Sequence, residues 1–361
     1  MTEMPVVPHL TRLSRNVTRI LGQNPSKFTL QGTNTYLVGQ TNPYILVDTA
    51  EGRDEYIPYL REALLNPGID IVKDKPDVSD VILTHKHHDH VNGLPSVLAL
   101  LQQLWSDRNP GEPFIGPRIH KFPLLSAEVE KVLATLPSGS FTPSPSGLVL
   151  HSLHEGQTFH VTQLPSTPDK QQARQSSSTL QVIHTPGHTS DSLCLYFPPD
   201  SALFTADTVL GSGSSVFEDL HTYMSSLRQL IKFKSASDGS RRYTIIYPGH
   251  GPTAPHDQVD TYLSHRVDRE NQVLKAIKEE PPTEKILKPE EVEESEEEVE
   301  VHWTTWEIMK SIYAEKYPEA LWEPAAHSVH LHLHKLVVDG KVEKGEGEGF
   351  HTKWKFLNEQ A

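Results

Sequence analysis

The segment Thr84–His90, which reads THKHHDH, constrains the fold of this chain more than any other feature. It directly follows the apolar run Val78–Leu83, which is typical of a buried strand, and it holds four histidines and one aspartate. Apolar residues at helical spacing then predict a helix over residues 93–106. A strand, a histidine-rich loop and a helix in this order indicate an α/β layer fold.

The same arrangement recurs three times further along the chain. His188 follows the predicted strand Leu180–Ile183, Asp207 follows Ala202–Thr205, and His250 follows Tyr243–Tyr247. His188 and His250 each come after a Pro-Gly turn. An open sheet presents its site at the ends of its strands, so we expect these side chains to meet there.

The types of these side chains indicate a metal site. Neutral imidazole and carboxylate suit Zn²⁺ and related divalent ions, which take four or five ligands. We expect His85 and His87 on a tight turn to point into one cavity, with Asp89 and His90 supplying a second group. Four residues cannot complete two coordination spheres, so the strand-end residues must contribute. For a single histidine an ordinary surface role would be the better interpretation, but a cluster with three further strand-end ligands favours the metal.

Several other elements are predicted from local patterns. Residues 28–50 indicate a β-hairpin with its turn at Thr41–Pro43, and residues 54–65 indicate a helix. Leu148–Phe159 predicts a pair of strands with a turn at His154–Gly156, between loops rich in proline and serine. The single cysteine, Cys194, excludes an internal disulfide and a multi-cysteine zinc site, and within a predicted strand it is expected in the core.

The net charge of −14 is concentrated in one segment. Residues 279–300 hold 11 Glu and 2 Lys, whereas residues 301–361 hold 7 Lys and 9 acidic residues. Residues 1–278 therefore carry a net charge of only −3. A block of like charge stays solvated, so we interpret 279–300 as an acidic flexible linker, with a partner-binding acidic segment as the alternative. At about 150 residues per domain, the length fits two domains.

The motifs at these positions resemble those of the metallo-β-lactamase superfamily. They are Thr84–His90, Thr185–His188, Ala206–Asp207 and Tyr247–His250, and further segments resemble its β-lactamase-like protein 2 branch: Asn24–Pro25, Phe28–Val38, Gly211–Asp219 and Tyr262–Arg266. The resemblance implies an αββα sandwich over residues 1–278.

The resemblance also implies a role for each candidate ligand. A first zinc would be bound by His85, His87 and His188, a second by Asp89, His90 and His250, and Asp207 would bridge the two. A hydroxide shared by two Zn²⁺ ions would attack the substrate, with Asp89 as the catalytic residue that orients it. His88 has no ligand role in this pattern, and the absence of a ligand cysteine disfavours β-lactam hydrolysis.

Residues 301–361 resemble the small winged-helix domain that closes this branch. Helices are predicted over 304–314, with Trp306, Met309, Ile312 and Tyr313 on one face, and over 323–338, followed by strands near 341–344 and 352–356. The second helix contains four histidines: His327, His330, His332 and His334. Their spacing spreads them around the helix, which favours solvated or packing roles over metal binding.

Two enzymatic functions remain open, and they differ in their substrate. Fungal relatives in polyketide pathways are thioesterases that release acyl chains from an acyl carrier protein, and animal members are endoribonucleases that act on single-stranded RNA. RNA binding normally uses a basic stripe, whereas residues 1–278 and 301–361 are mildly acidic, so we favour the thioesterase. A non-catalytic protein of the same fold is disfavoured by the complete ligand set. We expect no membrane span and a cytoplasmic location, with the mitochondrion also open.

Overall fold

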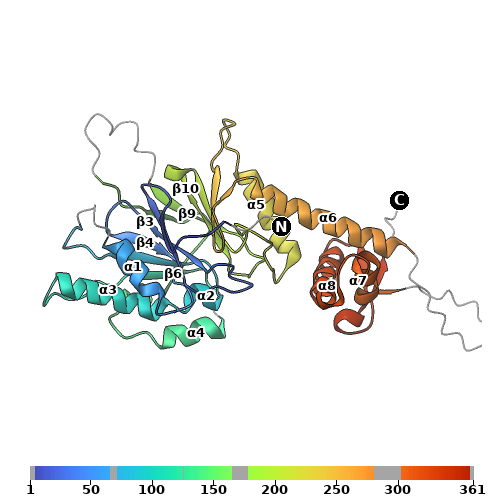
Figure 1. The fold of residues 1–361 in the computed structure, drawn as a ribbon, viewed down its shortest axis with the longest axis horizontal. Helices are drawn as coiled ribbons and strands as arrows, with labels where there is room; N and C mark the ends of the chain where they lie inside the picture. The colour runs from blue at the N-terminus through green and yellow to red at the C-terminus, as the bar shows by residue number, and fades with distance from the viewer. Residues whose placement is uncertain (1–4, 66–70, 125, 165–177, 280–301, 358–361) are drawn as a thin grey trace, which may run out of the picture. The chain divides into compact units, whose positions relative to one another are not determined.

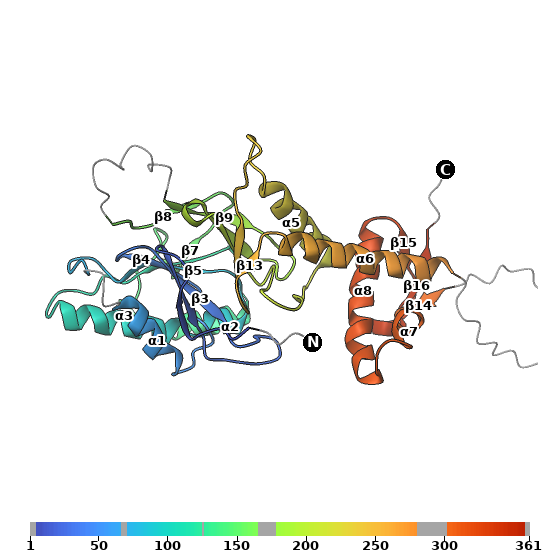
Figure 2. The same ribbon diagram turned by 45° about the horizontal axis from the view of Figure 1, so that its top comes forward.

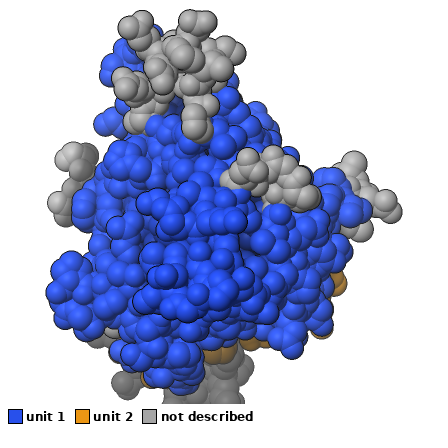
Figure 3. All heavy atoms as spheres, turned by 90° about the vertical axis from the view of Figure 1, so that its left-hand side faces the viewer, with its two compact units in different colours: residues 1–218, 225–262 blue, residues 219–224, 263–361 orange. Residues whose placement is uncertain are grey.

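The computed structural model describes residues 5–65, 71–124, 126–164, 178–279 and 302–357 (Figure 1). The chain divides into two compact units, coloured separately in Figure 3. The larger consists of residues 1–218 and 225–262, and the smaller of residues 219–224 and 263–361. The acidic linker expected over 279–300 lies outside the described residues, except for Glu279.

The larger unit contains two sheets. The first has seven strands in the order of the chain: β1 (Leu10–Arg12), β2 (Val17–Leu21), β3 (Asn34–Val38), β4 (Tyr44–Val47), β5 (Val78–Leu83), β6 (Arg118–Lys121) and β7 (Leu150–Ser152). The second has six: β8 (Thr158–His160), β9 (Thr179–His184), β10 (Leu193–Phe197), β11 (Ala202–Ala206), β12 (Ile245–Pro248) and β13 (Ala254–Pro255). Strands β4 to β7 run parallel, as do β11 and β12, and the other pairs are antiparallel.

Side chains alternate between two cores along the central strands. In β4, Ile45 faces the core between the sheets, whereas Leu46 faces the core beneath helices α1 (Tyr56–Leu64) and α3 (Leu94–Arg108). A strand buried on both faces reads as a continuous apolar run, which is why the sequence of β4 shows no alternation.

Helices cover the outer face of each sheet (Figures 1 and 2). Helices α1, α3 and α4 (Ala127–Ala134) cover the first. On the second, Phe233 of α5 (Leu220–Phe233) packs edge-on against Tyr196 of β10, with ring centroids 5.1 Å apart. This layering confirms the αββα sandwich.

Most elements predicted from the sequence are confirmed, including the hairpin β3–β4, helices α1 and α3, and the strands that precede each candidate ligand. The strand pair predicted within Leu148–Phe159 is wrong in one respect. Both strands form, but β7 joins the edge of the first sheet and β8 the edge of the second, so the turn between them carries the chain from one sheet to the other.

The smaller unit confirms the expected winged helix. It contains α7 (Thr305–Tyr313), α8 (Trp322–Val338) and a sheet of β14 (Trp303–Thr304), β16 (Lys353–Phe356) and β15 (Val342–Lys344). Thr304 caps α7 in a capping box with Glu307. All four residues of the predicted apolar face of α7 belong to the core of this unit or pack against it, and the fully buried Ile308 joins them.

In the part of the chain that the structure describes, no helix has the length and apolar character needed to span a bilayer.

Candidate metal centre

The seven candidate ligands converge at one edge of the larger unit. His85 and His87 follow the end of β5, and Asp89 and His90 lie in the short helix α2 (His88–Val91). Helix α2 begins directly after the loop, which is how residues so close in sequence point into one site. His188 follows β9, Asp207 follows β11, and His250 follows β12.

His85, His87 and His188 form the first cluster. Nε2 of His85 lies 3.0 Å from Nδ1 of His87 and 3.3 Å from Nε2 of His188, and the His87 and His188 nitrogens are 3.0 Å apart. Ligand nitrogens at 2.0–2.1 Å from one tetrahedral ion are separated by about 3.3 Å. The three nitrogens therefore have the spacing of ligands that share a single ion.

Asp89, His90 and His250 form the second cluster. Nε2 of His90 and Nε2 of His250 are 3.4 Å apart, and Oδ2 of Asp89 lies 3.4 Å from the first and 3.3 Å from the second. These separations again match the edges of one coordination polyhedron. Each of the two clusters, the first together with Asp207, could hold a metal ion.

Asp207 lies between the clusters. Its Oδ2 is 3.7 Å from Nε2 of His188 in the first cluster and 3.1 Å from Nε2 of His250 in the second. Its Oδ1 is buried without a hydrogen-bond partner among the described residues. A buried carboxylate oxygen without a donor is costly, and a cation would satisfy it. Gly249 leaves room for this oxygen, because a Cβ at that position would lie only 2.1 Å from it.

Three of the histidines are oriented through the ring nitrogen that faces away from their cluster. Nδ1 of His90 lies 2.8 Å from the carboxylate of Asp48, and Nδ1 of His188 lies 2.7 Å from the carbonyl oxygen of Val216. Nδ1 of His85 is 3.0 Å from the hydroxyl of Thr84. Such partners fix the tautomer that turns the free nitrogen towards a metal.

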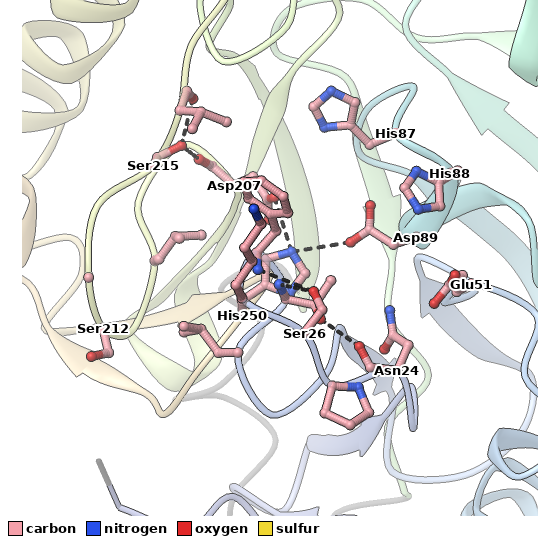
Figure 4. A pocket seen from close by; sticks show the side chains of 18 of the residues that line it. Asn24, Ser26, Glu51, His87, His88, Asp89, Asp207, Ser212, Ser215 and His250 are labelled. Carbon is pink, nitrogen blue, oxygen red and sulfur yellow. Dashed lines mark hydrogen bonds and ion pairs between the residues drawn. The ribbon is translucent and has the colours of Figure 1, made fainter. Parts of the chain in front are cut away.

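Asp89 is held in the same manner. The Thr33 hydroxyl donates to Oδ2 of Asp89 at 3.0 Å, and the Asn24 amide donates to the same hydroxyl at 3.0 Å. This chain of hydrogen bonds fixes the carboxylate in the cavity shown in Figure 4, where Asp89, Asp207 and His250 face one another.

The electrostatics of the two clusters differ. Burial lowers the pKa of His87 to about 4, helped by the neighbouring His188, so the first cluster offers neutral imidazoles. Burial also lowers the pKa of His250, but Asp207 and Asp89 outweigh it and raise the pKa to about 9. The second cluster therefore attracts positive charge, which protons supply when no metal does. Both conditions suit a divalent cation.

The site opens into a cavity of about 490 Å³. Its polar wall includes His87, His88, Asp89, Asp207 and His250 (Figure 4). Phe28 and Val216 line its mouth with 65% and 60% of their surfaces exposed. Exposed apolar side chains beside a polar cavity mark a surface that binds part of a ligand.

The structure brings all seven predicted residues together, in the two groups expected. His88 is exposed at the cavity and stands outside both clusters. Cys194 is fully buried in β10, and burial raises the pKa of its thiol to about 12, which confirms a core role.

The residues that orient the ligands, above all Asp48 and Thr33, were not predicted from the sequence. Asp48 follows β4 at a strand end, as the recognised ligands do, and that position was the available signal. Its backbone has a left-handed φ of 60°, which aspartate tolerates better than most residues.

Comparisons with known proteins agree with this geometry. The family model described as "Metallo-beta-lactamase superfamily" matches residues 28–105 and 165–258, and "Beta-lactamase associated winged helix domain" matches residues 304–354. A "Beta-lactamase-like protein 2 homolog" of Drosophila melanogaster is 32% identical over 97% of this chain and 98% of its own length. An "Atrochrysone carboxyl ACP thioesterase" of Aspergillus novofumigatus is 32% identical over 77% of this chain and 67% of its own length.

The fold is shared with solved structures at lower sequence identity. A beta-lactamase domain protein from Burkholderia ambifaria has a TM-score of 0.61 and 15% identity, over 96% of this chain and 93% of that one.

Proposed function

This chain belongs to the metallo-beta-lactamase superfamily of hydrolases. We propose that it is a dinuclear zinc thioesterase that releases acyl chains from an acyl carrier protein. The observation that carries the proposal is the pair of ligand clusters joined by Asp207, which opens into a cavity with an apolar mouth.

The donor set supports zinc. Five imidazoles and two carboxylates, with no thiolate, suit Zn²⁺ in two spheres: His85, His87 and His188 in the first, Asp89, His90 and His250 in the second, and Asp207 in both. When bound, zinc would activate water at neutral pH and polarise the bond under attack.

The attacking water would be oriented by a side chain of the protein. Asp89 keeps one oxygen hydrogen-bonded to Thr33, so its carboxylate has a fixed direction from which to align the attacking water. Burial raises the pKa of Asp89, but His90 and hydrogen bonds from His250 and His90 lower it well below its ordinary range, so this carboxylate is ionised. An ionised, oriented carboxylate suits both ligation and alignment of the nucleophile.

The cavity mouth supports an acyl substrate. Phe28 and Val216 offer apolar surface for an acyl chain, and Leu30 and Leu210 continue it inwards. A thiolate also leaves readily, because its conjugate thiol has a pKa near ~8.5 and needs no strong general acid. The relative named as an ACP thioesterase supports the same substrate class.

The charged side chains that line the cavity support an RNA substrate less well than a thioester. Of its two lining cations, Arg53 lies 3.4 Å from the carboxylate of Glu51, and the Lys27 ammonium lies 4.9 Å from the Phe28 ring centroid. A protein groove that binds a phosphate backbone needs several cationic side chains that are free to face the phosphates.

A paired assay tests the proposal. The zinc-loaded chain is offered acyl-pantetheine and acyl-carrier-protein thioesters in one arm and single-stranded RNA in the other, with Asp207→Ala as the control in both. We expect thioester turnover that the substitution abolishes. Cleavage of RNA that depends on Asp207, without thioester turnover, would establish the endoribonuclease instead.

A further inference from the structure

We propose that helix α8 of the winged helix carries a second, separate binding site for an imidazole-preferring divalent metal ion such as Zn²⁺, with His330 and His334 as its ligands. This site shares no residue with the metal centre of the larger unit. Within residues 302–357, it is formed entirely by the α7–α8 helices and the wing.

The geometry of the two imidazoles carries the inference. His330 and His334 are four residues apart on α8, and their Nε2 atoms are 3.1 Å apart. The ring centroids are 4.5 Å apart with an interplanar angle of 75°. This distance lies within the range of 3.0–3.4 Å found in the two clusters of the larger unit and is close to the tetrahedral edge of about 3.3 Å. Two histidines at positions i and i+4 on one helix face are an established way to hold Zn²⁺.

A buried hydroxyl orients His330. Nδ1 of His330 lies 3.2 Å from Oγ1 of Thr305, which also accepts a hydrogen bond of 2.9 Å from Nε1 of Trp354. A hydroxyl has two lone pairs, so it can accept from both rings. With its proton on Nδ1, His330 turns the Nε2 lone pair towards His334, as metal-ligating histidines do.

Aromatic rings hold both imidazoles in place. The Trp354 ring centroid lies 5.7 Å from that of His330 and 5.2 Å from that of His334, and the Phe350 centroid lies 6.0 Å from His330. Rings that are already fixed lose little side-chain entropy when they bind an ion.

The charge state suits ligation. Burial, together with the neighbouring His334 and His327, lowers the pKa of His330 to about 4, so this imidazole is neutral at pH 7. Burial and Lys344 also lower the pKa of His334. Neutral imidazoles bind a metal without first losing a proton.

The other two histidines of α8 clarify the site. His332 is fully buried and its Nδ1 lies 2.8 Å from the carbonyl oxygen of Ser328, so it packs in the core as expected from the sequence. The expectation that all four spread around the helix is wrong for the remaining three, because positions 327, 330 and 334 fall within one arc of about 60° at 100° per residue. Exposed His327 lies one turn before His330 and could add a third ligand after a change of rotamer.

Metal counting in the full chain tests the inference. The protein is equilibrated by dialysis against a series of buffered free Zn²⁺ concentrations, and the zinc bound at each concentration is counted. We expect the wild type to bind one equivalent more than His330→Gln/His334→Gln. The double variant His154→Gln/His160→Gln, which removes two exposed histidines of the larger unit, is expected to match the wild type.

The outcomes separate this site from the first centre. Equal stoichiometry and affinity in the wild type and the α8 variant would overturn the inference, whatever the hydrolytic activity. Because His330 packs against Trp354, His334→Gln alone is measured as well; it leaves the Thr305 contact in place and is expected to weaken binding at least about tenfold. Asp207→Ala should lose metal at the first centre and keep the α8 equivalent.

Discussion

The carboxylate of Asp48 lies 2.8 Å from Nδ1 of His90, on the side of the ring away from Asp89 and His250. The same carboxylate accepts hydrogen bonds from the backbone and hydroxyl of Thr84, at 2.8 and 2.9 Å. Asp48 therefore joins the end of β5 to a ligand in helix α2. It sets which nitrogen of His90 faces Asp89 and His250, and it supplies negative charge behind the ring.

Asp48→Asn is expected to lower zinc affinity and thioester turnover by about 10- to 100-fold. Asparagine tolerates the left-handed backbone and can still accept from Thr84, but it removes the charge behind His90. Zinc retained after dialysis against a graded chelator series measures the effect. Exposed Asp54→Asn is the matched control and should retain wild-type zinc. Unchanged retention in Asp48→Asn would show that His90 needs no orienting carboxylate.

Asp207→Ala is expected to lower turnover by at least about 100-fold and to reduce the zinc content of the larger unit. The reason is that its carboxylate lies between the two clusters and supplies negative charge to both. Metal analysis after gel filtration, together with thioester turnover, provides the measurement. If the variant kept wild-type turnover and two zinc ions at this centre, the dinuclear proposal would fail.

Removal of the metal is expected to lower the unfolding temperature of the larger unit. Asp48, Asp89 and Asp207 lie together in a buried site, and a bound ion stabilises the folded state because the unfolded chain has no such cluster. Differential scanning calorimetry before and after chelation measures the shift, and added zinc should reverse it. An unchanged transition would mean that the clusters hold no tightly bound ion.

The strand ends made the convergence of the candidate ligands predictable from the sequence. His188, Asp207 and His250 each follow an apolar strand, and parallel strands bring such residues to one edge. Contacts between segments far apart in the sequence could not be predicted, and the pairing of Thr33 with Asp89 joins residues 56 positions apart. The strands β7 and β8 show the same limit: local pattern identified both, but their partners belong to different sheets.

Phe28→Ala is expected to raise KM for long-chain acyl thioesters about 5- to 10-fold and to leave short-chain substrates nearly unchanged. The exposed ring at the cavity mouth offers apolar area that only a long chain covers, worth about 1 kcal/mol or slightly more. Kinetics over a series of acyl lengths provide the measurement. Val6→Ala removes an apolar side chain that is even more exposed and does not line the cavity, and it serves as the control. Equal effects at every chain length would argue against an acyl-binding mouth.

Asp80 makes a stability contribution that depends on pH. Burial raises its pKa, but hydrogen bonds from His120, Arg118 and Ser79 outweigh burial and lower the pKa to about 2. Because the folded pKa lies below the ordinary value of about 3.9, this stabilisation is present above that value and disappears as the pH falls towards 2.

Asp80→Asn is therefore expected to destabilise the larger unit by about 2 kcal/mol at pH 6, and the difference from the wild type should shrink as the pH falls below 4. The charge is what the substitution removes, and below pH 4 the wild-type carboxyl loses the same charge by protonation. Urea unfolding at pH 6, 4 and 3 measures the free energies of unfolding. Exposed Asp54→Asn should show no such trend. A difference that stayed constant between pH 6 and 3 would mean that Asp80 stabilises β5 through shape and neutral hydrogen bonds instead of charge.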